Sequence, residues 1–355
     1  MFAEMSLSST QSGLYFCRKD GLTARALSTV MTGRHRIKPK QEPYMALLIE
    51  TGLSNWISDD DIARSLQAVL PDADIRTADT LGNPDDITML AVVDMQRDHP
   101  TRLSNLKLVQ KLGAGVETIV SHPGLPGHVR IARLKPDAPA QGIAEWFLAY
   151  ILRAQRHMAF HEAAQTRAEW SPRAPVFTPD TVVGVLGLGH IGARTARMLH
   201  AVGFQVMGWS RTPKAIEGAT CLHGQDALPA LLGQCDHVCA ILPSTPQTAG
   251  LFDARMLAAM KPGSQLLNAG RGNLIDEGAL IAALDAGVPG HAVLDVTSRE
   301  PLPQDSPLWR HPGVTITPHV SGWHLGDALS DVAENFQRLC SGAPLLHEVN
   351  RDQGY

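Results

Sequence analysis

From Met45 onward, apolar residues follow two alternating patterns. Short apolar runs, typical of buried strands, are separated by longer segments in which apolar positions recur every three to four residues, as on one face of a helix. Strands that alternate with helices predict an α/β protein whose parallel sheets are covered by helices on both faces. In the first part of the chain, strands are expected at 45–50, 74–77, 89–94, 106–112 and 129–134. Together they predict one small doubly wound domain.

A helical pattern over 141–169 follows, and Pro172, Pro175 and Pro179 prevent its continuation, so 171–180 is expected to cross between domains as an arm. A second series of strands is expected at 182–186, 205–209, 237–241, 265–268, 292–295 and 315–317. Six such strands are typical of a dinucleotide-binding sheet. The last helical pattern, 323–340, is too short to fold alone and is expected to pack on the first domain.

Residues 1–44 lack either apolar pattern and contain seven Lys and Arg against three Asp and Glu. They are interpreted as a disordered tail, with an upstream start codon or a non-native extension as its simplest origin. A transit peptide is the alternative, because such peptides are rich in Arg and Ser and poor in acids.

Composition excludes several classes of protein. A chain of 355 residues suggests two domains, and 44% hydrophobic with 19% charged residues excludes a mostly disordered chain. The net charge of −4 lacks the basic footprint of a nucleic-acid-binding protein. Five cysteines without a C-x-x-C pair indicate reduced thiols and a cytoplasmic location. No apolar run approaches the roughly 18 residues of a membrane span, and no export signal opens the chain, so no membrane partner is expected.

Cys235, His237 and Cys239 are the residues that invite a metal interpretation. No second pair of ligands follows them, so small thiols in a buried strand are preferred and no metal is expected.

The clearest local motif is the glycine turn that follows the strand expected at 182–186. Gly187 permits a tight turn, Gly189 lets the backbone approach a pyrophosphate, and Gly192 lets the next helix press on the strand. His190 and Ile191 complete the turn, and the helix N-terminus supplies free N–H groups for the phosphates. The turn therefore predicts a dinucleotide site.

The end of the following strand predicts which dinucleotide is bound. Dinucleotide sites that prefer NADH place an acid there to hold the ribose 2′-hydroxyl. This chain instead has Ser210, Arg211, Thr212 and Lys214, with no carboxylate before Glu217. Cations and hydroxyls suit a 2′-phosphate, so NADPH is expected in preference to NADH.

Three further segments follow predicted strand ends, where open α/β sheets bind their ligands. They contain Arg271, Glu300 and His319, and each residue taken alone also has an ordinary structural interpretation.

At this point the chain resembles the D-isomer-specific 2-hydroxyacid dehydrogenases over about residues 45–342, and within them most closely the NADPH-dependent glyoxylate/hydroxypyruvate reductases. Seven ordered motifs carry the resemblance beside the Gly187 turn: Leu112-Gly-Ala-Gly-Val-Glu, Trp209-Ser-Arg-Thr-Pro-Lys, Leu242-Pro-Ser-Thr-Pro-Gln-Thr, Asn268-Ala-Gly-Arg-Gly, Arg299-Glu-Pro-Leu-Pro, Ser306-Pro-Leu-Trp and Val314-Thr-Ile-Thr-Pro-His.

The resemblance implies a Rossmann coenzyme domain, 144–319, inserted into a flavodoxin-like substrate domain made of 45–143 and 320–355, and a homodimer. It implies that Arg271, Glu300 and His319 are the catalytic set, and that Ala114 and Gly115 hold the substrate carboxylate opposite Arg271. The further cofactor contacts that it implies are Leu242, Pro243, Thr245, Ala269 and Asp295.

The residue types fit the reduction of a small 2-keto acid such as glyoxylate or hydroxypyruvate. Hydride adds to the carbonyl carbon while an acid protonates the developing alkoxide, which suits His319 with Glu300 keeping it charged and aimed. Arg271 would clamp the carboxylate. Trp323 and His324 either line the pocket or pack at the last helix. A lactate, glycerate or phenylpyruvate type of dehydrogenase and a dinucleotide-sensing protein without catalysis remain alternatives.

Overall fold

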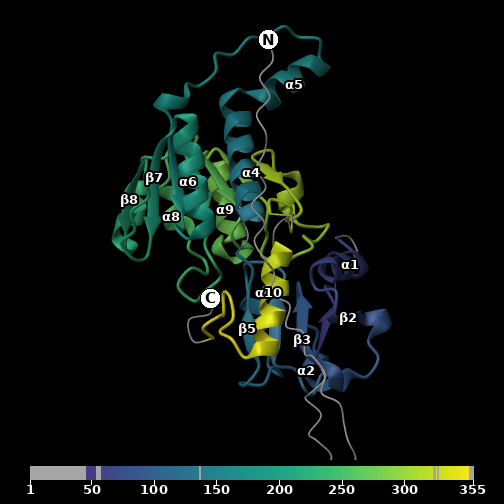
Figure 1. Ribbon diagram of the computed structural model, residues 1–355. Coiled ribbons are helices and arrows are strands. Elements are labelled where there is room, and N and C mark those ends of the chain that lie inside the picture. The colour runs from purple at the N-terminus through teal and green to yellow at the C-terminus, as the bar shows by residue number, and fades with distance from the viewer. Residues whose placement is uncertain (1–44, 53–56, 136, 323–324, 326–327, 352–355) are drawn as a thin grey trace, which may run out of the picture. The chain divides into compact units, whose positions relative to one another are not determined.

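The computed structural model describes residues 45–52, 57–135, 137–322, 325 and 328–351 (Figure 1). The expected tail 1–44 and the residues Trp323 and His324 lie outside this described part. Within it the chain forms two parallel sheets covered by helices, so the predicted α/β class is confirmed.

The first sheet is built from the N-terminal third of the chain and has the order β2-β1-β3-β4-β5. Its strands are β1 (Ala46–Ile49), β2 (Asp74–Thr77), β3 (Ile87–Val92), β4 (Leu108–Lys111) and β5 (Arg130–Ala132). Its helices are α1 (Asp59–Val69), α2 (His99–Arg102) and α3 (Glu117–Val120), and the 3₁₀ turns η1 (Ala78–Thr80) and η2 (Pro84–Asp86) connect β2 to β3.

The C-terminal helix α10 (Ala328–Ser341) packs on this first sheet (Figure 1). Val332 and Phe336 join the same apolar cluster as Leu47 of β1. Asn335 is fully buried, donates to the Gln110 Oε1 atom at 2.8 Å and accepts from the Leu346 N–H at 2.7 Å. The two ends of the described chain therefore share one core.

The second sheet has seven parallel strands in the order β12-β11-β10-β9-β6-β7-β8. They are β6 (Val182–Leu186), β7 (Gln205–Ser210), β8 (Ala219–His223), β9 (His237–Ala240), β10 (Gln265–Asn268), β11 (His291–Leu294) and β12 (Val314–Ile316). The helices are α6 (His190–Val202), α7 (Leu228–Leu232), α8 (Ala254–Ala258) and α9 (Glu277–Asp285), with 3₁₀ turns η3 (Thr178–Asp180), η4 (Gln225–Ala227), η5 (Gly272–Leu274) and η6 (Pro307–Arg310).

Two details of the sequence interpretation are wrong. The prediction of six strands missed β8, an edge strand with no fully buried residue, so its sequence carries a weak apolar signal. The single helix expected over 141–169 is two helices, α4 (Asp137–Gln155) and α5 (Met158–Thr166). They are separated at His157, whose φ of 51° lies in the left-handed region and whose Nε2 lies 3.0 Å from the Ala174 carbonyl oxygen.

Helix α4 covers one face of the second sheet. Phe147 and Ile151 are fully buried and pack in one cluster with Val183 of β6 and Leu199 of α6. Among the described residues, no helix is both long and apolar enough to cross a membrane.

In both sheets a change in the direction of strand order creates the place where open α/β sheets bind ligands. In the second sheet that point lies between β6 and β9, and in the first between β1 and β3. The loops after β4, β6, β7, β9, β10, β11 and β12, which carry the predicted site residues, all leave the carboxyl ends of their strands.

Candidate active site

The turn after β6 is shaped for a closely approaching ligand. Gly187 has a φ of +101°, and a Cβ placed on it would lie 2.4 Å from the Ile241 carbonyl oxygen. A Cβ on Gly192 would lie 1.7 Å from the Gly187 oxygen, so the helix start and the strand end touch through glycine alone. A Cβ on Gly189 would meet no atom within 4 Å. Gly189 therefore borders open space at the turn.

Helix α6 begins at this turn without a side-chain cap. The first N–H groups of a helix have no partner within the helix, and they carry its positive dipole end. The N–H groups of His190, Ile191 and Gly192 are in this position. His190 is half-exposed, and its Nε2 lies 3.2 Å from the Asp137 Oδ1 atom. The turn and helix start fit a pyrophosphate.

The end of β7 presents cations and hydroxyls. Ser210 is buried and its hydroxyl donates to the Thr212 carbonyl oxygen at 2.9 Å, which shapes the bend after the strand. Arg211, Thr212 and Lys214 are exposed. A ribose held at the strand end would find positive charge and hydroxyls, which fits a 2′-phosphate.

The loop after β9 begins next to the Gly187 turn, where Ile241 and Leu242 lie close to Gly187. Leu242 is buried, Pro243 is exposed and Thr245 is partly buried. The Thr248 hydroxyl accepts from the Thr245 N–H at 2.9 Å and donates to the Pro243 oxygen at 2.6 Å, which fixes the loop.

Asp295 directly follows β11 and organises the segment that carries His319. Its side chain is among the buried polar groups, with 2% of the residue exposed. The carboxylate accepts hydrogen bonds from the Thr317 hydroxyl and from the N–H groups of Val320 at 2.9 Å and Ser321 at 3.0 Å. The Asp295 carbonyl also accepts the His319 N–H at 2.8 Å. Asp295, expected near the cofactor, thus holds the loop around His319, while Ala269 lies partly buried after β10.

His319 and Glu300 lie side by side. The His319 Nδ1 and Glu300 Oε2 atoms are 2.8 Å apart, and the side chains are 54% and 38% exposed. Burial raises the pKa of Glu300, but its hydrogen bond to His319 and the His319 charge outweigh this, and the net pKa is lowered. With Nδ1 donating to the carboxylate, Nε2 is the ring nitrogen left to meet a substrate.

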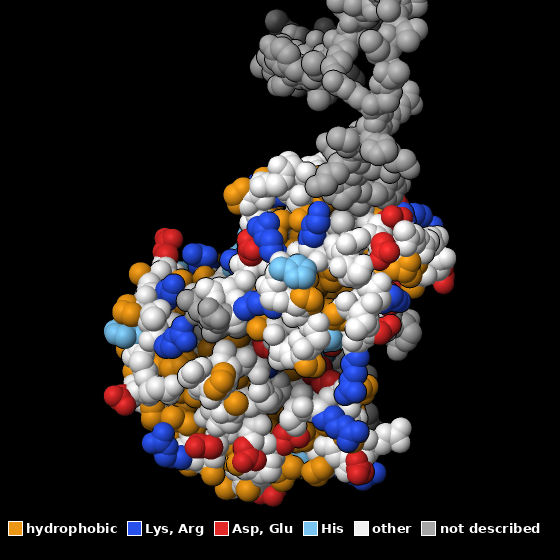
Figure 2. All heavy atoms as spheres, turned by 90° about the horizontal axis from the view of Figure 1, so that it is seen from below, with side chains coloured by type: hydrophobic (Ala, Val, Ile, Leu, Met, Phe, Trp, Pro, Cys, Tyr) orange, Lys and Arg blue, Asp and Glu red, His pale blue; other side chains and the backbone are white. Residues whose placement is uncertain are grey.

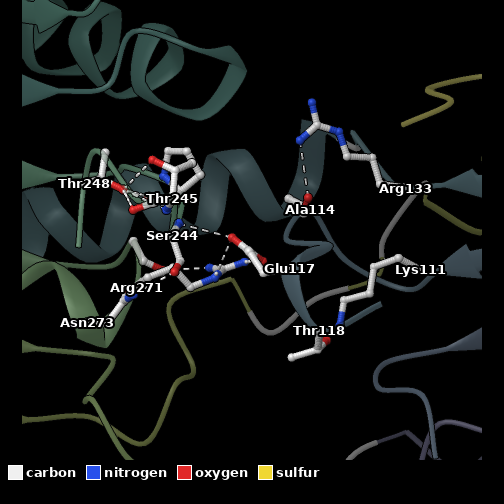
Figure 3. Close-up of polar contacts among 12 residues, drawn as sticks. Lys111, Ala114, Glu117, Thr118, Arg133, Ser244, Thr245, Thr248, Arg271 and Asn273 are labelled. Carbon is white, nitrogen blue, oxygen red and sulfur yellow. Dashed lines mark hydrogen bonds and ion pairs between the residues drawn. The ribbon is translucent and has the colours of Figure 1, made fainter. Parts of the chain in front are cut away.

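Arg271 follows β10, directly before η5, and contacts Glu117 of the first sheet's side of the site (Figure 3). Its Nε is 3.3 Å from Oε1 of Glu117, and its Nη2 is 3.3 Å from Oε2. A Cβ on Gly115 would lie 1.3 Å from the Arg271 Nη2 atom, so a larger residue there would displace the guanidinium. The charge of Arg271 also helps to lower the pKa of Glu300. The three residues expected to be catalytic therefore occupy one region.

The loop after β4 brings Ala114 and Gly115 to this region. Ala114 is exposed, and its carbonyl oxygen accepts from Arg133 Nη1 at 3.4 Å. Lys111, at the end of β4, donates to the Val93 carbonyl oxygen, and burial lowers the pKa of its ammonium to about 8. The loop thus lies among several basic groups, as a site for an anion requires.

The chain was compared with known proteins. Residues 148–321 match the family described as D-isomer specific 2-hydroxyacid dehydrogenase, NAD binding domain. A glyoxylate/hydroxypyruvate reductase A of Serratia proteamaculans (strain 568) is 40% identical over 256 residues, which cover 70% of this chain and 82% of that protein. This chain belongs to the D-isomer specific 2-hydroxyacid dehydrogenase family. The resemblance seen in the motifs is confirmed.

Solved structures of this dehydrogenase family agree. A D-isomer specific 2-hydroxyacid dehydrogenase from Xanthobacter autotrophicus Py2, in complex with NADPH and MES, is 39% identical with a TM-score of 0.81, covering 87% of this chain and 99% of that chain. An NADPH-dependent glyoxylate/hydroxypyruvate reductase from Sinorhizobium meliloti, in complex with NADP and sulfate, is 32% identical with a TM-score of 0.79, covering 87% of this chain and 100% of that chain.

The sequence interpretation of this dehydrogenase overlooked two residues. Glu117 was part of a quoted motif without a role, and Ser244 was assigned none. Oε1 of Glu117 accepts the Ser244 N–H at 3.3 Å, and Asn273 Nδ2 donates to the Ser244 hydroxyl at 2.7 Å. A carboxylate directly after the glycine loop was the one signal in the sequence.

Cys235 and Cys239 are fully buried, and burial raises the pKa of Cys235 to about 12.

Proposed function

We propose that this protein reduces small 2-keto acids, glyoxylate and hydroxypyruvate above all, to 2-hydroxy acids with NADPH as hydride donor. The observation that carries the proposal is the His319–Glu300 pair at 2.8 Å, with one imidazole nitrogen free of the carboxylate. Relatives named glyoxylate/hydroxypyruvate reductase and a relative in complex with NADPH support the choice of substrate and cofactor.

The substrate is held by Arg271 together with Ala114 and Gly115. A guanidinium fork matches a planar carboxylate and polarises the neighbouring keto oxygen. His319 donates its Nε2 proton to that oxygen as it becomes an alkoxide, and Glu300 keeps the imidazole oriented through its contact with Nδ1. These roles fit the positions of the side chains at the carboxyl ends of the strands.

The cofactor site is proposed to run across the turn after β6. When bound, the reduced nicotinamide supplies the hydride. Gly187, Gly189, His190, Ile191 and Gly192 hold the pyrophosphate. The further proposed contacts are Ser210, Arg211, Thr212 and Lys214 for the 2′-phosphate, and Leu242, Pro243, Thr245, Ala269 and Asp295 toward the nicotinamide.

A steady-state screen tests the function. The purified protein is given glyoxylate, hydroxypyruvate, pyruvate or phenylpyruvate, each with NADPH or NADH, and oxidation of the cofactor is followed by absorbance. The highest kcat/KM is expected for glyoxylate or hydroxypyruvate with NADPH. A preference for pyruvate or phenylpyruvate would indicate another 2-hydroxyacid dehydrogenase. Tight dinucleotide binding without any turnover would indicate a sensor.

The domain organisation is part of the proposal. Residues 45–143 and 320–355 form the substrate domain, and 144–319 form the coenzyme domain. The packing of α10 on the first sheet supports this division. A cytoplasmic location is supported by free thiols at Cys221, Cys235, Cys239 and Cys340 within the described residues.

Small molecules are the proposed partners, with neither nucleic acid nor membrane. The net charge is −4, and Lys and Arg side chains are interspersed with Asp and Glu on the face seen in Figure 2. A nucleic-acid site would instead gather cations on one face.

A homodimer is proposed to form through α5 and the arm that follows it. Trp170 is 97% exposed and Phe177 71% exposed, and such large apolar side chains favour burial by a second copy. Light scattering after gel filtration is expected to give a dimer for the wild type and a monomer for the Trp170→Ala/Phe177→Ala variant. Trp309→Ala, at a 50% exposed tryptophan elsewhere, is the control and stays dimeric. A monomeric wild type would refute the proposal.

A further inference from the structure

Glu117 is a charged group in the site that the proposed chemistry does not use. It begins α3, directly after the glycine loop of the first sheet, whereas its partner Arg271 follows β10 of the second sheet (Figure 3). The two carboxylate oxygens face Nε and Nη2 of the guanidinium, each at 3.3 Å. This edge of the guanidinium is one that pairs with a planar carboxylate through two parallel N–H···O contacts. Glu117 therefore occupies it.

The other sides of the guanidinium are also taken. Nη1 donates to the Gly270 carbonyl oxygen at 2.7 Å. Nη2 lies against Gly115, so closely that a Cβ there would be 1.3 Å away. A substrate carboxylate consequently has no position between Gly115 and Arg271 in this arrangement. For the substrate to bind as proposed, Glu117 must leave this edge of the guanidinium and Arg271 must move away from Gly115.

The Glu117 carboxylate is held as a bound anion would be. Besides the guanidinium, it accepts the backbone N–H of Ser244 at 3.3 Å. Burial raises the pKa of Glu117, but the charge of Arg271 and the hydrogen bonds outweigh this, so the net pKa is lowered and the group is ionised at neutral pH. A guanidinium and a backbone N–H are also the donors that a keto acid carboxylate would use.

The contacts of Glu117 are suited to exchange. Charge-assisted N–H···O bonds are usually about 2.7–2.9 Å long, and all three contacts here are 3.3 Å. The side chains of Arg271 and Glu117 are 32% and 25% exposed, so water screens the pair. Such partly exposed pairs contribute little to stability, and an arriving anion can replace one partner.

We propose that Glu117 is an internal competitor for the substrate: its carboxylate occupies the place of the substrate carboxylate on Arg271 and is displaced when a 2-keto acid binds. This inference rests on the proposed function. The affinity for substrate is reduced by the fraction of molecules in which Arg271 is occupied. Glu117 thereby sets KM, while hydride and proton transfer proceed without it.

The test compares Glu117→Gln, which keeps the shape but removes the charge, with Glu117→Asp, which keeps the charge but shortens the side chain by one methylene. Glu348→Gln is the matched control, because Glu348 pairs with Arg130 through two contacts of 2.7 Å away from the site. Two quantities are measured: KM and kcat for glyoxylate with NADPH, and the dissociation constant of oxalate by calorimetry without cofactor.

For Glu117→Gln, both KM and the oxalate dissociation constant are expected to fall about fivefold, as for the loss of a weak competing ion pair, with kcat within about twofold of the wild type. Glu117→Asp is expected to lower both about twofold or more, because its shorter carboxylate loses contact with Arg271. Glu348→Gln is expected to match the wild type.

Three results would overturn the inference. One is an unchanged or raised KM in Glu117→Gln, and another is a joint loss in kcat and rise in KM, which would make Glu117 a support that holds Arg271 in place. The third is a wild-type KM in Glu117→Asp. That result would mean that the negative charge raises KM at a distance, without direct contact between the carboxylate and Arg271. A wild type without keto acid reduction would instead refute the proposed function, and oxalate binding would still decide the role of Glu117.

Discussion

Glu50 and Glu300 are two glutamates beside basic partners, in two different regions of the molecule. Glu50 follows β1 in the first sheet, where its Oε1 lies 3.1 Å from His99 Nε2 and its Oε2 contacts Arg102. His99 is fully buried and the Glu50 side chain is 9% exposed. Glu300 follows β11, and both it and His319 reach solvent.

The two histidines differ in whether a ring nitrogen is available to a ligand. His99 Nδ1 accepts the Gln96 N–H at 3.1 Å and its Nε2 lies 3.1 Å from Oε1 of Glu50, so both ring nitrogens face protein atoms rather than solvent. In the other pair, Nδ1 of His319 faces Glu300, which leaves Nε2 for a substrate. A buried, closed cluster fixes the fold because opening it leaves a charge without a partner. A half-exposed pair contributes little to stability and can exchange a proton.

Replacing His319, the exposed imidazole, should have the largest effect, and that effect should fall on kcat rather than on stability. His319→Gln is expected to lower kcat about 10²–10⁴-fold, because the proton donor to the alkoxide is lost. The unfolding free energy should change by less than about 0.5 kcal/mol, as for other exposed side chains. NADPH oxidation and urea unfolding measure the two quantities. His311→Gln, at an imidazole 3.3 Å from Asp285, is the control and should keep the wild-type kcat. A loss of kcat below tenfold in His319→Gln would contradict the assigned role.

Removing the charge of Glu50 from the buried cluster should lower stability but leave kcat nearly unchanged. Glu50→Gln is expected to lower the unfolding free energy by about 1–3 kcal/mol, because the carboxylate that faces buried His99 and the partly exposed Arg102 is lost. The kcat of the folded enzyme should stay within a few-fold of the wild type. Urea unfolding with activity measured on the same preparations tests both. A stable but inactive variant would contradict the structural role of Glu50.

The same cluster predicts a dependence of stability on pH. The hydrogen bond from His99 lowers the pKa of Glu50, burial opposes this, and Arg102 adds to the lowering, so the net pKa falls below 4.5. A carboxyl whose pKa is lowered on folding stabilises the protein above its unfolded pKa, and this contribution is lost as pH falls through the folded value. The difference in stability between wild type and Glu50→Gln should therefore be full at pH 6 and shrink below about pH 4.5. A difference that stays constant down to pH 3 would exclude this linkage.

Arg211, an exposed cation at the end of β7, extends the comparison from catalysis to cofactor binding. Arg211→Ala is expected to raise KM for NADPH about tenfold and KM for NADH less than about twofold, because only NADPH carries the 2′-phosphate. Arg255→Ala, at an exposed arginine on α8, is the control and should change neither value. Equal weakening of both cofactors would refute the 2′-phosphate assignment.

The smallest expected effect concerns the carboxylate of the exposed pair. In Glu300→Gln, kcat for glyoxylate is expected to fall about two- to fivefold, because an amide holds the His319 ring with a weaker hydrogen bond than a carboxylate does. The measurement is the initial rate with saturating glyoxylate and NADPH. An unchanged kcat would show that the carboxylate is not needed to orient the ring.

Much of the fold could be predicted because buried parallel strands are continuous apolar runs. β2, β6 and β10 lie at the residues predicted, and the other predicted strands differ at their ends by at most two residues. The edge strand β8 was missed because a half-exposed strand has no such run. The separation of α4 from α5 was missed because His157 adopts a left-handed conformation that its residue type does not announce.

The candidate site was predictable only in part. Arg271, Glu300 and His319 were singled out because they follow strand ends, where topology places ligands, and their catalytic roles, which the family resemblance implies, stay predictions. The contact between Glu117 and Arg271 was not, because 154 residues separate them and nothing in either segment specifies the other as partner.

The sequence by itself determined which segments form buried strands, where glycine turns allow phosphate to approach, and which chemical groups stand at the strand ends, because these depend on local sterics and on hydrophobic spacing. Only the tertiary structure decided which groups meet and how much water reaches them. The free energy of a charge depends on its surroundings, so the same pairing of glutamate and histidine stabilises the fold at Glu50 and is open to a substrate at Glu300.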